Sequence, residues 1–375
     1  MEIIIHRGTH QIGGCATEIR SAHTRILIDF GSELPDSRGR MPVDTLKIDG
    51  LNQGKQDFAG IFLTHYHGDH LGLIAQISTA YSSRVKSELA NVSDRIRPLD
   101  ALEPVIVGDL TVIPLPADHS AYGAFMYLVE GDGKRVLHTG DFRLHGFRGR
   151  ATPKLLSRYA GNVNVLIIEG TQLSRNSRSG LSEHELQKRL KAEIAENKYV
   201  FALCASTHID RLASLCNATP RGRYFVCDKY QYDLLKRVAA GTDSRWYQFT
   251  KMLSYGENLK LRERGFVMPV RANSDFAHLV SRWTEAVLIY SMWEGYLDGR
   301  SQALSEFVRS FEETGRLRRL HSSGHATSAD IRAVCNQIQP KCGVIPIHTE
   351  YREGLKQIGI TCPVLRLEDR EVFSL

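Results

Sequence analysis

The chain has 375 residues, of which 42% are hydrophobic and 24% charged, an ordinary composition for a globular protein. This length allows one large or two ordinary domains, and no run approaches the roughly eighteen apolar residues of a bilayer-spanning helix. The seven cysteines are scattered and form no C-x-x-C pair. This pattern excludes a disulfide framework and a zinc knuckle, and we expect reduced core cysteines of a cytoplasmic protein.

The net charge of +6 is unevenly distributed along the chain. Residues 171–319 hold 24 Lys and Arg against 17 Asp and Glu, an excess of +7, whereas the remainder holds 24 against 25. A basic segment of this kind suits a polyanionic partner such as nucleic acid, although a solvated basic face would have the same composition.

The first third of the sequence predicts short strands and turns. Its start shows an apolar strand and lacks a basic-then-apolar signal segment. One helix is predicted at residues 69–81. Strands are predicted at residues 1–10, 25–30, 58–65, 110–120, 124–141 and 163–171, the fifth as a hairpin over Gly131-Asp132-Gly133. This alternation, with polar residues at strand ends, indicates an α/β layered domain with a site along one edge.

From Thr171 onward the pattern changes to a regular alternation of helices and strands. Helices are predicted at residues 181–196, 208–218 and 229–240, and strands at 198–206, 223–228 and 285–291. Ser182 and Glu185 form a capping-box pair at the first of these helices. The segment therefore predicts a second, Rossmann-like unit, without the G-x-G-x-x-G fingerprint of a dinucleotide site. After Arg319 short strands ending in histidines return.

The sequence HYHGDH at residues 65–70 concentrates three histidines and one aspartate directly after an apolar strand. Imidazole and carboxylate are ligands of zinc and related divalent metals. Their spacing cannot place all four on one helix face, but a loop followed by a helix can gather them around two adjacent metals. More ligands would then be needed, and strand ends offer His119, Asp141 and His348.

The motif H-x-H-x-D-H after an apolar strand resembles the signature of the metallo-β-lactamase superfamily. Further matches to that superfamily follow in chain order: Asp29 in LIDFG, His119 in PADHS and Asp141 in HTGDF. Three more motifs resemble those of the β-CASP nucleases, a family that includes RNase J: Glu169 in IIEGT, His325 in HSSGHAT and His348 in IPIHTE. The motifs run from residue 29 to residue 348, so the resemblance covers nearly the whole chain.

This resemblance implies an α/β fold in two parts. Residues 1–170 and 320–375 would form an αββα metallo-β-lactamase sandwich. The basic residues 171–319 would form a Rossmann-like β-CASP domain inserted into it.

The resemblance also implies a role for each motif residue. One zinc would be held by His65, His67 and His119, and the other by Asp69, His70 and His348. Asp141 would bridge the two metals, and Asp29 would orient the ligands. Manganese is an alternative to zinc. Two such metals would supply a nucleophilic water and bind the scissile phosphate, so Asp69 belongs to the catalytic machinery. His325 would protonate the leaving oxygen and Glu169 would hold it, although a structural carboxylate is the alternative for Glu169.

Two further segments, residues 205–211 and 321–326, resemble loops that hold substrate phosphate in RNase J. The resemblance assigns phosphate contacts to Ser206, Thr207, Arg211, His321, Ser323 and Gly324. Hydroxyls at a helix N-terminus suit an anion, and ordinary N-capping by Ser206 or Thr207 is the alternative. His208 departs from the asparagine of the relatives.

The expected function is a two-zinc nuclease that hydrolyses single-stranded RNA, by 5′-exonuclease or endonuclease action. His348 favours the RNA-processing branch, whereas LHTGDFR resembles the DNA-repair branch, so a DNA nuclease is the first alternative. A thioesterase- or lactonase-like hydrolase is the second, although the basic segment and the Glu169–His325 pair argue against it. No membrane association is expected, and the oligomeric state stays open.

Overall fold

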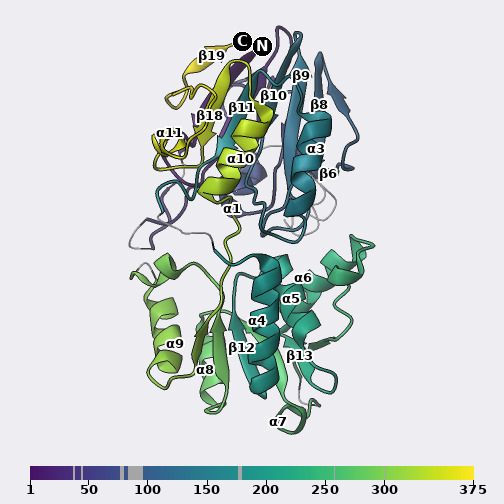
Figure 1. Cartoon of the computed structure of the whole chain (residues 1–375), viewed down its shortest axis with the longest axis vertical. Coiled ribbons are helices and arrows are strands. Elements are labelled where there is room, and N and C mark those ends of the chain that lie inside the picture. The colour runs from purple at the N-terminus through teal and green to yellow at the C-terminus, as the bar shows by residue number, and fades with distance from the viewer. Residues whose placement is uncertain are drawn as a thin grey trace. The chain divides into compact units, whose positions relative to one another are not determined.

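The computed structural model describes residues 1–36, 39–43, 45–76, 80–82, 96–175, 180–256, 258–299 and 301–375. The chain divides into two compact units. Unit 1 comprises Met1–Leu34, Met41–Ser179 and Gly324–Leu375, and unit 2 comprises Pro35–Arg40 and Gly180–Ser323. Figure 1 shows the purple N-terminal and yellow C-terminal segments together in unit 1, so most of unit 2 is an insertion into it.

Unit 1 is built on two sheets. In the described residues, the first sheet has the order β19 (Val372–Ser374), β1 (Glu2–Arg7), β2 (Ala16–Arg20), β3 (Arg25–Ile28), β4 (Gly60–Phe62), β5 (Ala80–Ser82), β6 (Ile96–Pro98). The second has the order β18 (Gly343–Ile347), β11 (Val165–Glu169), β10 (Lys134–His138), β9 (Phe125–Gly131), β8 (Leu110–Pro116), β7 (Val105–Val107). The strands β9 and β10 form the predicted hairpin.

The two sheets share one apolar core, because alternate residues of each strand point to the same face. Ile3 and Ile5 of β1 pack there with Val112 of β8 and Tyr127 of β9. Helices cover the other face of the second sheet (Figure 1): α3 (Thr152–Tyr159), α10 (Ser328–Ile338) and α11 (Gly354–Gln357). The predicted α/β fold class, with a metallo-β-lactamase-type sandwich, is confirmed.

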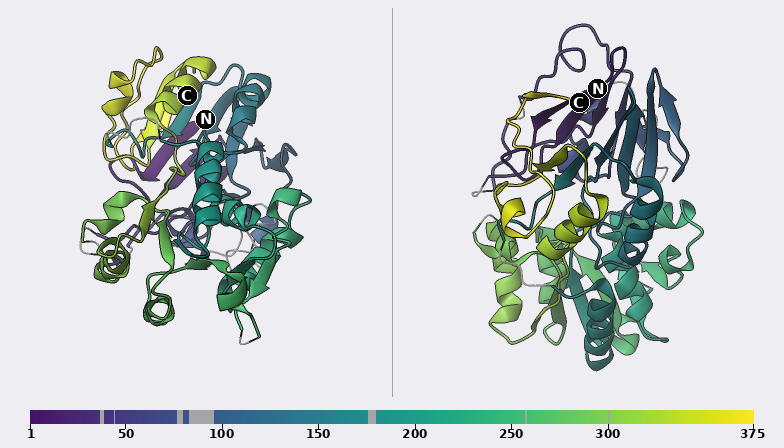
Figure 2. Two further views of the ribbon diagram at one scale, coloured as in Figure 1. Left: turned by 60° about the horizontal axis from the view of Figure 1, so that its bottom comes forward. Right: turned by 45° about the horizontal axis from the view of Figure 1, so that its top comes forward.

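The last part of the chain completes both sheets of unit 1. Strand β18 follows unit 2 in sequence yet pairs in parallel with β11, from Val165 opposite Gly343 to Glu169 opposite Ile347. Strand β19 pairs antiparallel with β1, so the two ends of the chain lie side by side, as both views of Figure 2 show.

Unit 2 contains a sheet in which every described pair of strands is parallel. Its order is β14 (Met252–Ser254), β13 (Tyr224–Cys227), β15 (Phe266–Val270), β12 (Tyr199–Leu203), β16 (Val287–Tyr290), β17 (Leu317–Arg319). Its helices are α4 (Glu183–Glu196), α5 (Ile209–Ala218), α6 (Lys229–Ala240), α7 (Leu261–Arg264), α8 (Ser274–Ser281) and α9 (Gln302–Glu312). Phe276 of α8 and Phe307 of α9 pack on Phe201 and Leu288 of the sheet.

The helix predicted at residues 69–81 is broken in the structure. Helix α1 covers only Gly68–Leu71, the 3-10 turn η1 covers Ile74–Gln76, and the backbone is a strand at β5; residues 77–79 lie outside the described part. The cause is a competing set of backbone bonds. Phe30 N–H donates to His70 O at 2.8 Å and Leu73 N–H donates to Phe30 O at 3.0 Å, so this segment is tied to the end of β3.

Strand β15 was not among the strands predicted from the sequence. The structure places it between β12 and β13, with Pro269 opposite Ala202. Among the described helices, none has the length and apolar character needed to cross a bilayer.

Arg211 was expected to contact substrate phosphate, but it is fully buried inside unit 2. Its Nη2 donates to Glu183 Oε1 at 2.9 Å and its Nη1 donates to Ser291 Oγ. The Ser291 hydroxyl in turn donates to the Leu320 carbonyl. Arg211 therefore links α4 and α5 to the ends of β16 and β17, and a direct phosphate contact from this side chain is not supported.

We expect Glu183→Ala to destabilise the protein by about 3–5 kcal/mol, because it leaves the Arg211 charge buried without its carboxylate partner. Urea unfolding followed by circular dichroism measures the loss. Asp233→Ala is the control, because it breaks the exposed Lys229–Asp233 pair, and it should cost less than about 1 kcal/mol. Equal effects of the two substitutions would contradict a structural role for the buried pair.

Candidate metal centre

The predicted metal ligands follow the carboxyl ends of strands in unit 1. Asp29 follows β3, the cluster at residues 65–70 follows β4, His119 follows β8, Asp141 follows β10 and His348 follows β18. Strands β3 and β4 are parallel, and so are β10, β11 and β18; β8 runs with them because β9 is antiparallel to both β8 and β10. Each sheet therefore delivers its polar residues to one end.

His65, His67 and His119 form the first group of converging nitrogens. His67 Nδ1 lies 3.0 Å from His65 Nε2 and 3.3 Å from His119 Nε2. Nitrogens bound tetrahedrally to zinc at about 2.0–2.1 Å stand roughly 3.3–3.4 Å apart, close to these separations. The other nitrogen of His119, Nδ1, donates to the Gly324 carbonyl at 2.6 Å, which leaves the Nε2 lone pair for a metal.

The second group gathers around two carboxylates. His348 Nε2 lies 3.1 Å from Asp69 Oδ2, and His70 Nε2 lies 3.9 Å from the same oxygen. Asp141 Oδ2 lies 3.2 Å from His70 Nε2 and 3.7 Å from His65 Nε2, so Asp141 stands between the two groups. This is the position that a bridging ligand requires.

Asp29 and Thr64 set the orientation of two histidines. The Thr64 N–H and hydroxyl donate to the two oxygens of Asp29 at 2.7 and 2.8 Å. The hydroxyl oxygen is then free to accept from His65 Nδ1 at 3.1 Å, and His70 Nδ1 donates to Asp29 Oδ2 at 2.8 Å. Both histidines are therefore held in the tautomer that presents Nε2 as a ligand.

Two of these residues have a positive φ, a backbone conformation that residues other than glycine rarely adopt. Asp29 has φ of 61° and His348 has φ of 53°. Such strain is retained where the surrounding contacts over-determine it. For His348 these contacts are the bond from its N–H to Gly8 O at 2.8 Å and that between its Nδ1 and Thr171 Oγ1 at 2.7 Å.

His325 and Glu169 form a pair beside the second group. His325 Nδ1 lies 3.0 Å from Glu169 Oε2 and 3.5 Å from Asp141 Oδ2. Glu169 is fully buried, and its other oxygen accepts the N–H groups of Phe142 and Ala326 at 2.8 and 3.3 Å. The His325 side chain is 23% exposed, whereas its partner carboxylate is inaccessible, so the imidazole alone faces the solvent side of the pair.

The electrostatics of the cluster favour a bound cation. Burial lowers the pKa of His65 and His119 well below the usual value, and lowers that of His67 to about 4, so these rings are neutral near pH 7. Burial alone would raise the pKa of Asp141, but the charges of His348, His70 and His325 outweigh it and hold the carboxyl ionised. The site thus combines neutral lone pairs with a buried anion.

A further observation supports the fit of these residues to a metal ion. Both oxygens of Asp141, which is 2% exposed, and Nε2 of His70 make no hydrogen bond to any part of the chain that the structure describes. Burying an ionised carboxylate without hydrogen bonds is costly, and a coordinated cation removes that cost. One ligand atom from each of His65, His70 and Asp141 lies within 4.8 Å of the others.

The residues assigned to phosphate contacts are divided between the two units. Ser206, Thr207, His321 and Ser323 belong to unit 2, and Gly324 belongs to unit 1, where its carbonyl orients His119. The alternative of an N-cap at Ser206 or Thr207 is not observed. His208 caps α5 instead, because its Nδ1 accepts the Arg211 N–H at 3.3 Å.

Sequence reasoning missed three groups that contact the ligands: Thr64, Thr171 and Cys15. A threonine or a lone cysteine carries no metal signal of its own in a sequence. The threonine after an apolar strand and before the first histidine of the cluster could have been found by its position alone.

We expect Asp29→Ala to weaken metal binding by about 10–100-fold, because His70 loses its acceptor and Thr64 loses the bond that orients it toward His65. Competition of the metal-loaded protein with a chelator measures the change. Asp100→Ala, an exposed aspartate of the same unit, should leave the affinity unaltered. An unchanged affinity in the Asp29 variant would mean that the hydrogen bonds of Asp29 and Thr64 do not orient the metal ligands.

Two family models match the chain. A β-lactamase superfamily domain matches residues 24–197, which include six of the seven predicted ligands. A Zn-dependent metallo-hydrolase RNA specificity domain matches residues 314–357, which include His325 and His348. The two matches together contain every residue of the candidate centre except Cys15.

Several characterised proteins are similar in sequence. Ribonuclease J 2 of Streptococcus pyogenes serotype M3 is 22% identical over 365 residues, covering 87% of this chain and 66% of that enzyme. Ribonuclease J of Helicobacter pylori is 25% identical over 154 residues, covering 36% and 22%. The mouse (Mus musculus) DNA cross-link repair 1A protein is 32% identical over 146 residues, covering 36% and 14%. The chain thus spans 66% or less of the length of each of these relatives.

A solved structure extends the similarity to the whole fold. A protein of unknown function from Enterococcus faecalis V583 superposes with a TM-score of 0.81 at 21% identity, covering 100% of this chain and 99% of that one. The strand-end residues, the two domain matches and the similarity to ribonuclease J 2 over 87% of this chain agree with one another. The chain carries a β-lactamase superfamily domain and a Zn-dependent metallo-hydrolase domain, and these matches are consistent with an RNase J-like β-CASP protein among the metal-dependent hydrolases.

Proposed function

We propose that the protein is a nuclease that uses two zinc ions to hydrolyse phosphodiester bonds of single-stranded RNA. One observation carries this proposal: seven metal-capable side chains form two groups that share Asp141, with the His325–Glu169 pair beside them. A hydrolase of small esters has no evident need for a second acid beside a two-metal centre.

The residues divide by role. His65, His67 and His119 would hold one metal, and Asp69, His70 and His348 the other, with Asp141 common to both and manganese as an alternative ion. Two bound metals supply Lewis acidity, which lowers the pKa of water and neutralises charge on phosphate oxygens. The chain's own contribution is to hold the ligands in place from Asp29, Thr64, Thr171 and the Gly324 carbonyl.

His325 is suited to move the proton that the leaving oxygen needs. Burial alone would lower the pKa of His325, but the charges of Glu169 and Asp141 outweigh it and raise the pKa, with a smaller opposing effect from Arg175. A raised pKa favours the protonated imidazole, which is the form that a general acid requires. Glu169, anchored by two backbone N–H groups, fixes the ring and its charge.

RNA is the preferred substrate on two grounds. The similarity to ribonuclease J 2 covers 87% of this chain, whereas that to the DNA cross-link repair protein covers 36%. The segment that contains His325 and His348 matches a model described as an RNA specificity domain. The higher identity to the DNA-repair protein keeps a DNA nuclease as the alternative that experiments should test.

Unit 2 supplies a second line of support for a nucleic-acid substrate. Residues 171–319, most of which belong to unit 2, hold the +7 charge excess. Ser206 and Thr207 follow β12, and His321 and Ser323 follow β17, two strands of the same parallel sheet separated only by β16. Partly exposed hydroxyl and imidazole groups therefore lie at one edge of a basic unit, which is the usual place for an anion in such folds.

The substrate is tested with single-stranded RNA and DNA of one sequence, each with a 5′-monophosphate, on metal-stripped and zinc-loaded protein. We expect zinc-dependent cleavage of RNA that exceeds cleavage of DNA and weakens steeply with added salt, because counterions are released on binding. Product lengths distinguish stepwise from internal cleavage. Faster cleavage of DNA would select the alternative, and salt-independent hydrolysis of a thioester without nuclease activity would overturn the proposal.

We expect His325→Ala to slow RNA cleavage by about 10²–10⁴-fold while both metals stay bound, because only proton transfer is lost. Asp141→Ala should lose metal and activity together, and His278→Ala, an exposed histidine of unit 2, should change neither. Rates and metal content are measured on the same samples. Full activity of the His325 variant would show that another group protonates the leaving oxygen.

The pH profile provides a further readout for the same acid. His325 donates only when protonated, so kcat should be high below its raised pKa and fall as pH increases through it. Glu169→Gln removes the largest cause that raises this pKa, so the falling limb should move to lower pH. The limb should disappear in the residual activity of His325→Ala.

A further inference from the structure

Cys15 lies at the metal centre because of the way the first sheet is paired. It comes directly before β2, and β2 runs antiparallel to β3. The amino end of β2 therefore lies beside the carboxyl end of β3, where Asp29 is. The side chain is 1% exposed, and Cys15 is a free cysteine.

The backbone of Cys15 is fixed to the ligand loop. Its N–H donates to the Asp69 carbonyl at 3.0 Å, and its carbonyl accepts the Gly31 N–H at 3.0 Å. Gly8 lies on the other side of Cys15. Its carbonyl accepts the His348 N–H at 2.8 Å, and a Cβ added to Gly8 would lie 3.6 Å from the Cys15 sulfur. The thiol is thus held between the two segments that carry Asp69 and His348.

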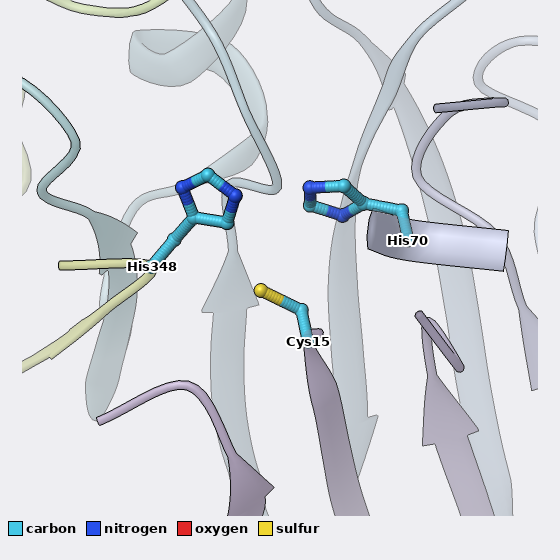
Figure 3. A group of neighbouring side chains, drawn as sticks. All are labelled: Cys15, His70 and His348. Carbon is cyan, nitrogen blue, oxygen red and sulfur yellow. The ribbon is translucent and has the colours of Figure 1, made fainter. Parts of the chain in front are cut away.

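The sulfur points toward two imidazoles of the second ligand group. Figure 3 shows it directed at the gap between the rings of His70 and His348. One ligand atom from each of these three residues lies within 4.8 Å of the others, and all three residues are buried. Bound tetrahedrally to one zinc, a sulfur and a nitrogen stand about 3.5 Å apart, so only a small contraction is required.

His70 presents a nitrogen without a hydrogen bond among the described residues, and His348 presents one whose partner, Asp69, is itself a proposed ligand. His70 Nδ1 is bonded to Asp29 and His348 Nδ1 to Thr171. His70 Nε2 makes no hydrogen bond within the described residues, although the ring is 1% exposed. A cysteine that served only as core filling would face apolar side chains, whereas this one faces two metal-capable rings.

We propose that Cys15 is a ligand of the second metal position, which it shares with His70 and His348. The thiol releases its proton to solvent as the thiolate binds the cation, so the step needs no oxidant or reductant. This inference rests on the metal centre of the proposed function and deepens it.

A thiolate changes which metal the second position prefers. The first position has three imidazoles, whereas the second would combine imidazole and carboxylate with one soft sulfur. Sulfur ligands favour zinc and cadmium, and oxygen ligands favour manganese and magnesium. The two positions should therefore differ in metal preference, with the second more selective for a thiophilic ion.

The first measurement uses the wild-type protein and needs no activity. X-ray absorption of the zinc-loaded protein should show zinc–sulfur scattering at about 2.3 Å beside nitrogen and oxygen neighbours. Replacement of zinc by cobalt(II) should produce a sulfur-to-cobalt charge-transfer band in the near ultraviolet. Bound metal with only nitrogen and oxygen neighbours and no such band would overturn the proposal for Cys15 but leave the nuclease proposal intact.

The second measurement uses a matched pair of variants. Cys15→Ser should lose the charge-transfer band and bind manganese better relative to cadmium, while Cys227→Ser, a buried cysteine of unit 2, should keep both properties of the wild type. Persistence of the band in a folded Cys15 variant would assign the sulfur to another cysteine and refute the proposal. A wild-type protein that binds no metal at all would refute the proposed function as well, so the two failures are distinguishable.

Discussion

The buried carboxylate of Asp141 is the constraint on which the site depends. Neither of its oxygens makes a hydrogen bond among the described residues, yet four imidazoles lie within 3.9 Å of it. An anion in that position is stable only if positive charge surrounds it. The arrangement of the cluster follows from this need: the rings of His70 and His325 carry raised pKa values in the metal-free chain, and a metal would take over the same electrostatic task.

The fold satisfies this constraint through rigid backbone contacts. The segment that carries Asp69 and His70 is tied to the end of β3 through Phe30, and the strained His348 is held by Gly8. At Gly31 a side chain would collide with the backbone of Asp69, so only glycine allows this approach. The precision of the site therefore comes from strand ends and their cross-links, which is the usual advantage of building a site on regular elements.

Much of the site could be predicted from the sequence because it consists of histidine and aspartate side chains, which have few other uses when they gather at the ends of strands. The limits are equally physical. The position of Cys15 could not be predicted without knowing that β2 is antiparallel to β3. Arg211 was assigned to phosphate because the sequence does not show the packing of α4 on α5, which buries its side chain against Glu183. Likewise, the helix expected at 69–81 is broken by tertiary backbone bonds at Phe30, which the sequence does not show.

The insertion of unit 2 into unit 1 determines when the centre can form on the ribosome. A nascent chain contains His65, His67 and His119 early, whereas His325, His348 and the edge strand β18 emerge only after nearly all of unit 2 has been made. At ordinary rates of translation that delay is roughly ten seconds or more. During this interval the growing polypeptide holds His65, His67 and His119 but neither His325 nor His348, so the cluster of converging side chains stays incomplete until unit 2 has been made.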